Sequence, residues 1–297
     1  MNRLSAALGA VVLSFGQTGV ASAADMPVKA PVAAPVSYNW TGFYIGANVG
    51  GGWDRTSADH ICNDFAAGGG IFGGCGFAAP VAGGTVPPPT SFKGSGWLAG
   101  LQAGYNYQIG AVVVGVEADY NWSRIRGAGT SNFLLLPVAG GGPANIVSKQ
   151  NLDSFGTIRG RLGWLPSQQW LIYATGGVAF GQANRDVTLS GPTIGAAGGG
   201  FGFICIAGQP CFQGSAKQSM FGWTVGVGSE WAISTNVTVK AEYLYANLPG
   251  ASLTAVAFNG AGQTPSSFQT TYGHTELHVA RIGINYRFNA APVVAKY

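Results

Sequence analysis

Residues 112–123 read VVVGVEADYNWS, and apolar and polar side chains alternate along this stretch with a period of two. One set of alternate positions is apolar: Val112, Val114, Val116, Ala118, Tyr120 and Trp122. The other set is small or polar: Gly115, Glu117, Asp119, Asn121 and Ser123. Because successive side chains of a β-strand point to opposite faces, the pattern predicts a strand whose two faces meet different solvents.

Seven further stretches show the same alternation and predict seven more strands: residues 41–53, 94–109, 156–164, 170–182, 221–231, 237–245 and 280–288. The stretch 170–182 is apolar on both faces, so its register stays open. Short turns at residues 109–111, 165–169 and 233–236 alternate with long connections rich in Gly, Pro and Ser. Outer-membrane barrels sort their connections in this way, with short periplasmic turns and long external loops.

The composition supports a surface that meets lipid. Charged residues make up 9% of the chain, against about 25% in ordinary soluble proteins. Beyond residue 23 no apolar stretch reaches the roughly 18–20 residues that a spanning helix needs. The other structure that spans a membrane is a closed barrel. We therefore expect an all-β fold, an eight-stranded antiparallel transmembrane up-and-down β-barrel with both termini in the periplasm of a Gram-negative bacterium.

The N-terminal segment is typical of an export signal. A basic start at Arg3 and an apolar stretch precede Ala21-Ser22-Ala23, a pattern that signal peptidase cleaves; a membrane anchor is the alternative. The predicted organisation is a signal peptide (1–23), a Pro/Ala-rich periplasmic tether (24–38), the outer-membrane barrel domain (39–288) and a C-terminal tail (289–297).

Nine ionisable residues of the predicted strands share the polar face: Glu117, Asp119, Arg159, Arg161, Glu230, Lys240, Glu242, Arg281 and Arg287. An Arg or Lys on the lipid side at mid-height costs about 2–4 kcal/mol, so we expect all nine in the barrel interior. An eight-stranded barrel is just wide enough for side chains to fill it. The nine charges therefore predict a buried pairing network, with an ion path as the alternative.

The eight tryptophans lie at or beside the ends of the predicted strands: Trp40, Trp53, Trp97, Trp122, Trp164, Trp170, Trp223 and Trp231. Indole rings favour the interface between membrane and water. We therefore expect two aromatic girdles, whereas a soluble core would gather tryptophan in mid-strand.

Four cysteines fall into two pairs that are close in sequence, Cys62 with Cys75 and Cys205 with Cys211. An exported chain meets an oxidising compartment, so we expect two disulfides. Neither spacing is a Cys-x-x-Cys metal or redox pattern.

No cofactor, metal or catalytic set is expected. His274, Glu276 and His278 share one face near the outer end of the last strand, but a third strong ligand is missing, so we interpret them as polar rim residues. We find no nucleophile paired with a base and predict that the chain is not an enzyme. The net charge of +4 includes no basic run, which argues against nucleic acid.

The chain resembles the small outer-membrane β-barrel proteins of alphaproteobacteria, of the RopB type in the porin or opacity-like family. The residues that carry the resemblance are NWTGFYIG (39–46), GYNY (104–107), VGVEAD (114–119), RGRLG (159–163), AEYLY (241–245) and RIGINYRF (281–288). The resemblance spans residues 40–288 and implies a structural or surface-exposed barrel without an enzymatic centre. Such barrels end in an aromatic assembly signal; here either Tyr297 serves or the signal is internal.

The expected function is a structural barrel that presents four external loops, supports envelope integrity and makes adhesive or host contacts. The alternative is a narrow channel for small solutes, and an outer-membrane enzyme ranks last. The expected partners are outer-membrane lipid and lipopolysaccharide, the barrel-assembly machinery and signal peptidase during biogenesis, and a host or envelope surface partner.

Overall fold

The computed structural model describes residues 38–62, 87–134, 142–193, 205–257 and 267–288. The strands are β1 Gly42–Cys62, β2 Thr90–Ile109, β3 Val112–Leu134, β4 Pro143–Ser167, β5 Trp170–Ser190, β6 Pro210–Ala232, β7 Val237–Leu248, β8 Ala251–Ala257, β9 Ser267–Tyr272 and β10 Thr275–Arg287. Within these described ranges, no helix is long and apolar enough to cross a membrane.

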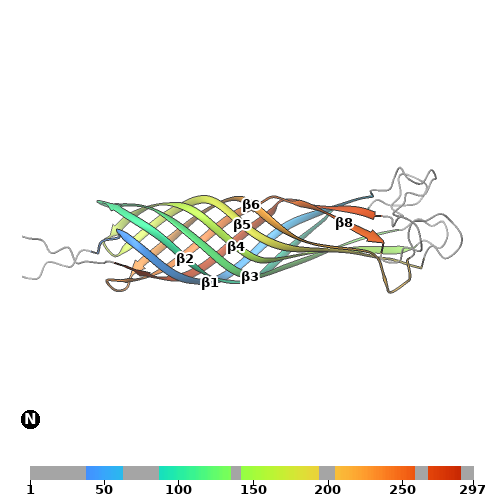
Figure 1. The fold of residues 1–297 in the computed structure, drawn as a ribbon, viewed down its shortest axis with the longest axis horizontal. Coiled ribbons are helices and arrows are strands. Elements are labelled where there is room, and N and C mark those ends of the chain that lie inside the picture. Colours follow the sequence, from blue (N-terminus) through green and yellow to red (C-terminus); the bar gives the residue numbers. More distant parts are fainter. Residues whose placement is uncertain (1–37, 63–86, 135–141, 194–204, 258–266, 289–297) are drawn as a thin grey trace, which may run out of the picture. The chain divides into compact units, whose positions relative to one another are not determined.

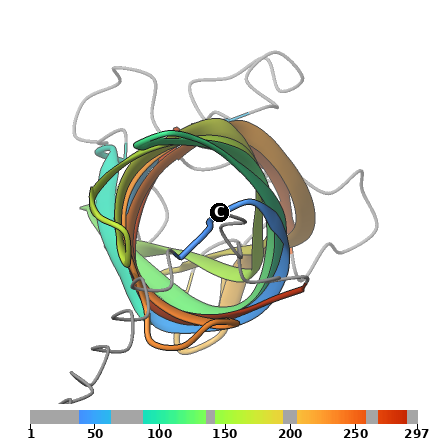
Figure 2. The ribbon, with the colours of Figure 1, turned by 90° about the vertical axis from the view of Figure 1, so that its left-hand side faces the viewer.

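Eight long strands form a closed antiparallel ring. Each of β1 to β7 pairs with its sequence neighbour, β10 follows β7, and β10 pairs with β1 from Tyr44↔Arg287 to Arg55↔Glu276. The strands run obliquely to the barrel axis (Figure 1), and the view along the axis shows the closed ring (Figure 2). The predicted eight-stranded antiparallel barrel is confirmed.

The strands β8 and β9 extend two members of the ring. β8 continues β7 and pairs with β6 at Phe212↔Ala257, while β9 continues toward β10 and pairs with β1 at Ala58↔Tyr272. They lie at the end of the barrel with the long connections, which we call the loop end; the opposite end, with the short turns, is the turn end. The strands continue beyond the level of Trp53 toward the loop end. We call this part of the barrel the extension.

The ring strands are longer than the sequence pattern predicts. β1 continues to Cys62 rather than Trp53, β4 begins at Pro143 rather than Gly156, and β6 begins at Pro210. The pattern fades there because an outward side chain beyond the lipid layer meets water, so a polar residue suits it as well as an apolar one. The inward side chains there remain buried, and some of them, such as Phe92 and Ile146, are apolar.

Each ring strand has one face inside and one outside. On β5, whose register the sequence left open, Leu171, Tyr173 and Thr175 are buried inside, while Ile172 and Val178 are exposed on the outer face. At the turn between β2 and β3, Gly110 has φ +60°, in the left-handed region that glycine enters at low cost. The described turn after β4 is shorter than predicted, because β4 runs on to Ser167.

Candidate functional site

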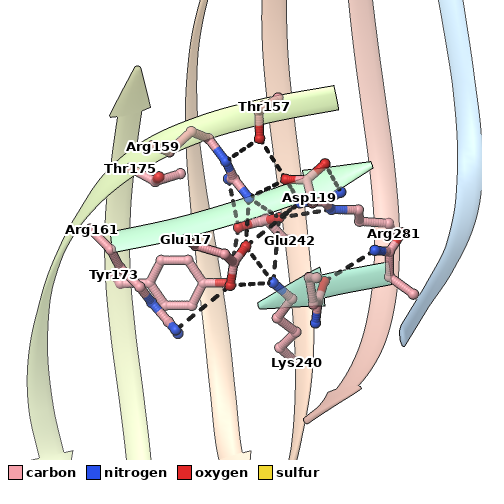
Figure 3. Close-up of polar contacts among 12 residues, drawn as sticks. Glu117, Asp119, Thr157, Arg159, Arg161, Tyr173, Thr175, Lys240, Glu242 and Arg281 are labelled. Carbon is pink, nitrogen blue, oxygen red and sulfur yellow. Dashed lines mark hydrogen bonds and ion pairs between the residues drawn. The ribbon is translucent and has the colours of Figure 1, made fainter. Parts of the chain in front are cut away.

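The structure places all nine predicted lumen charges inside the barrel, each at most 5% exposed. Eight of them form one ion network in the middle of the ring, and Figure 3 shows seven of these with neighbouring polar side chains. Four are acids, namely Glu117, Asp119, Glu230 and Glu242, and four are bases, namely Arg159, Arg161, Lys240 and Arg281. They come from β3, β4, β6, β7 and β10. The formal charge of this ion network is therefore zero.

Arg159 of β4 lies at the centre of the ion network (Figure 3). Its Nη2 is 2.6 Å from Glu117 Oε1 and 3.0 Å from Asp119 Oδ2, and its Nη1 donates to Glu242 Oε1 at 2.9 Å. The planar guanidinium presents several donors in one fork, which suits it to hold several carboxylates together. Arg159 thus links three of the four acids.

Two more cations complete the centre. Arg281 binds Asp119 with both terminal nitrogens, at 3.1 and 3.0 Å, and its Nε donates to Glu242 Oε2 at 2.8 Å. Lys240 Nζ lies 2.8 Å from both oxygens of Glu117. Bidentate and charge-assisted contacts of this kind are the strong ones among hydrogen bonds.

The fourth pair lies next to this centre. Arg161 binds Glu230, which also accepts hydrogen bonds from Thr238 and from Asn285 Nδ2 at 2.9 Å. The Arg161 guanidinium lies 3.7 Å from the ring centroid of Tyr173, in a cation–π contact.

Two tyrosines belong to the ion network and were not among the predicted site residues. Tyr44 of β1 donates to Glu117 Oε2 at 2.8 Å, and Tyr173 of β5 donates to Glu242 Oε1 at 3.1 Å. Each tyrosine ring packs against a glycine of the neighbouring strand. A Cβ added to Gly104 would clash with the Tyr44 hydroxyl, and one added to Gly228 would clash with the Tyr173 hydroxyl. The signal available in the sequence was an aromatic residue at a polar-face position, as at Tyr44.

Arg287 differs from the prediction, because it is buried without an acid partner in the described part of the chain. Its guanidinium lies 4.2 Å from the ring centroid of Tyr38 and donates to the backbone oxygen of Thr235 at 3.1 Å. It lies at the end of β10, at the turn end, whereas Glu117, Asp119 and Glu242 lie in mid-barrel. The position of Arg287 on the polar face correctly predicted that it points into the barrel. It did not predict where along the barrel axis Arg287 lies.

Trp40 is also a correction, since the structure buries it at 1% exposed instead of placing it in a girdle. Its indole nitrogen donates to the backbone oxygen of Gln168, and it packs with Tyr38, Leu165 and Leu171 at the turn end. Residues 38–41 therefore fold into the barrel and cap the turn end of the ion network.

The other seven tryptophans lie on the outer face: Trp53, Trp97, Trp122, Trp164, Trp170, Trp223 and Trp231. Trp170 is partly covered, because it donates to Ser229 Oγ and packs against Trp231. The outer face between the two aromatic rows is apolar, with Val116, Ile158 and Ile282 more than half exposed.

The interior between the ion network and the loop end is also filled. An apolar layer follows the network, with Leu98, Phe155 and Leu244 fully buried. A second polar layer comes next, in which Gln150 donates to Asp54 and accepts from Arg185. The extension then has an apolar core of its own: Ala58, Phe92, Phe133, Ala144, Ile146, Val187, Leu189, Cys205, Cys211, Phe212, Leu253, Ala255, Ala257, Phe268 and Tyr272.

The predicted disulfides and rim residues have different outcomes. Cys205 and Cys211 are bonded and buried in the core of the extension. The predicted pair of Cys62 and Cys75 lies outside the residues whose side chains are described. His278 Nδ1 is 2.6 Å from Tyr243 Oη, and His274 Nδ1 is 3.1 Å from Asn247 Oδ1. Across the described ranges, His, Cys, Asp and Glu side chains form no group that could hold a metal ion.

A closed antiparallel ring with an apolar outer belt, aromatic rows and an ionic interior defines the class of outer-membrane β-barrels. The model of the family described as outer membrane protein beta-barrel domain matches residues 19–288. The chain belongs to this family.

Two relatives by sequence agree with this assignment, and one solved structure serves for comparison only. A 31 kDa outer-membrane immunogenic protein of Brucella melitensis biotype 1 is 30% identical over 278 residues, which covers 90% of this chain and 93% of the relative. A 22 kDa outer membrane protein of Rhizobium leguminosarum bv. viciae is 30% identical over 48% of each chain. The crystal structure of outer membrane protein OprG from Pseudomonas aeruginosa has 12% identity and a TM-score of 0.39, covering 86% of this chain and all of that one.

Proposed function

We propose that this protein is a structural element of the outer membrane, which holds a filled and non-conducting barrel in the bilayer and presents the extension and its loops outside the cell. It supports the integrity of the envelope and offers a surface for adhesive or host contacts. The proposal includes no catalytic step. The signal peptide is removed after Ala23, and both termini face the periplasm.

The observation that carries the proposal is the filling of the barrel interior. From the turn end to the loop end, the interior holds the cap around Trp40, the ion network, the apolar layer, the second polar layer and the core of the extension. A conducting path would need these layers to open. Every carboxylate of the ion network is held by at least two cations or neutral donors, so opening would have to break several charge-assisted hydrogen bonds at once.

Conductance in planar lipid bilayers tests the proposal. We expect silence from the purified protein under conditions in which a known porin, inserted in the same way, gives discrete current steps. Reproducible single-channel steps that scale with salt concentration would refute the non-conducting barrel and favour the narrow channel instead.

The supporting role is tested in cells. Deletion of the gene should raise the sensitivity of the bacterium to detergent and to large antibiotics, and the wild-type gene should restore resistance. An unchanged sensitivity would contradict a role in envelope integrity. An epitope inserted within residues 258–266, between β8 and β9, should bind antibody on intact cells; binding only after permeabilisation would contradict the orientation.

A further inference from the structure

Four cations gather on the outer face of β1, β2 and β3, on the loop-end side of the aromatic row. Arg55, Lys93, Arg124 and Arg126 are exposed and point outward. They account for four of the 15 Lys and Arg residues in a chain that is only 9% charged. We call these four residues the basic patch.

The neighbouring tryptophans fix the height of the basic patch. Arg55 follows Trp53 by two positions and Arg124 follows Trp122 by two, while Lys93 precedes Trp97 by four. With about 3.3 Å per residue and a strand tilt of roughly 40°, the four cations lie roughly 5–10 Å beyond the aromatic row. Because such rows mark the membrane interface, this is the layer of the lipid headgroups.

The patch brings like charges together with little local compensation. Arg55 is directly opposite Lys93, and Arg126 is opposite Ser95, two positions from Lys93 on the same strand. Among the residues that the structure describes, none of the four takes part in an ion pair. Glu276 is opposite Arg55 on β10 and compensates part of one charge only. Like charges on opposite positions of a sheet are destabilising.

The neighbouring strands β4 and β5 carry acids beside their cations. Asp153 of β4 lies between the pairs Trp122↔Ser154 and Ile125↔Leu152, so it is the acid next to Arg124; its carboxylate accepts from Asn184 at 2.6 Å. Lys149 of β4 is directly opposite Asp186 of β5. The excess of positive charge therefore rests on Arg55, Lys93 and Arg126.

Aromatic faces complete the basic patch. The Arg124 guanidinium lies 5.9 Å from the ring centroid of Trp97, and this contact leaves its N–H donors free for a second partner. Arg and Lys are the residues that bind phosphate, Arg through its fork and Lys as a point charge. Basic clusters beside a membrane surface are typical of sites for anionic headgroups.

We propose that the basic patch binds the phosphate groups of a phosphorylated glycolipid in the outer leaflet, and so fixes such lipids against β1, β2 and β3. The inference rests on the proposed function, in which the loop end faces outside. It adds a defined lipid site to a barrel that would otherwise contact its membrane only through apolar side chains. The glycolipid phosphates supply the negative charge that the sheet lacks at this place.

Binding of bisphosphorylated lipid A to the purified barrel tests the proposal. The barrel is placed in nanodiscs of zwitterionic phospholipid, and retention of added lipid A is measured by native mass spectrometry. We expect the quadruple variant R55Q/K93Q/R124Q/R126Q to bind at least tenfold more weakly than the wild type. Removal of both lipid phosphates should weaken binding to the wild type by a similar factor, and raised salt should do the same.

The matched control is K149Q/K217Q, which removes two exposed cations from β4 and β6 and should leave binding unchanged. Mobility of unboiled samples on gels checks that each variant is folded. Equal binding by the wild type and a folded quadruple variant would overturn the proposal, as would equal binding of phosphorylated and dephosphorylated lipid A. Preference for a soluble sulfated polysaccharide over lipid A would overturn it in favour of an external polyanion.

The epitope between β8 and β9 separates this inference from the proposed function. If antibody reaches it on intact cells and the quadruple variant still binds lipid A like the wild type, the lipid site fails while the orientation stands. If antibody does not reach it, the orientation fails first.

Discussion

Each carboxylate of the ion network receives hydrogen bonds from three or more side chains. Glu117 is bound by Arg159, Lys240 and Tyr44. Asp119 is bound by Arg159, Arg281, Thr157 and Asn121. A buried ion pair is costly unless its geometry is good and the remaining lone pairs are satisfied. At the scale of single residues, the network meets that condition by using neutral donors beside the cations.

Replacement of Arg159 by Met should therefore be severe. The variant leaves Glu117, Asp119 and Glu242 with one cation fewer, and removal of one partner of a buried ion pair costs about 3–5 kcal/mol. Unfolding by guanidinium in detergent micelles, followed by tryptophan fluorescence, measures the loss. Replacement of Lys217, which is exposed on β6, by Met is the control and should cost less than about 0.5 kcal/mol. Equal effects would show that the ion network does not stabilise the barrel.

His60 should make the stability of the extension depend on pH. The His60 ring is buried between Thr270, whose Oγ1 lies 2.9 Å from Nδ1, and Phe268, and burial lowers the His60 pKa from 6.5 to about 4. The unfolded chain therefore binds a proton between pH 6.5 and 4 that the folded chain does not. Stability is fully present above pH 6.5 and falls toward pH 4, by at most about 3 kcal/mol.

Hydrogen exchange of the β1 and β9 amides, corrected for its intrinsic pH dependence, measures this effect. Protection should fall between pH 6.5 and 4 in the wild type and should fall less in H60Q. The same slope in both proteins would assign the pH dependence to another group.

At the scale of the strands, alternation alone predicted the ring and its faces, because a wrong register would have exposed charge to lipid. It could not predict the length of β1, β4 and β6. Beyond the lipid layer the outer face meets water, where polar and apolar side chains are both tolerated, so the alternation is lost. It placed Glu117 and Arg159 inside but not in contact. Which charges meet depends on the stagger of the closed ring, and so does the height of Arg287. Trp40 precedes β1, so the alternation along the strands could not predict its burial.

Replacement of Ile158 by Arg tests the lipid-facing side of β4. Ile158 is 56% exposed and lies on the apolar belt, where Arg costs about 2–4 kcal/mol. The yield of folded protein in the outer membrane should fall well below that of the wild type. The control, Gln213 to Arg, places the same side chain on the outer face of β6 in the extension and should assemble normally. Similar yields for both variants would mean that the belt does not face hydrocarbon.

At the scale of the whole barrel, stability depends on closure, and the seam between β1 and β10 joins strands far apart in sequence. Ala47 of β1 is opposite Leu101 on one side and Ile284 on the other, so β1 has no free edge there. Proline lacks the N–H that a central strand needs and is tolerated only at edges, first residues and bulges. The variant A47P should therefore open the seam.

The readout for A47P is the mobility of unboiled protein on denaturing gels. The wild type should run as a compact barrel when unboiled and shift on boiling, because a closed ring leaves no unpaired edge from which detergent can unfold it. A47P should run at the unfolded position in both samples. Ala251 begins β8 outside the ring, and A251P should keep the compact form. If A47P also keeps it, stability rests on the filled interior alone and ring closure contributes little.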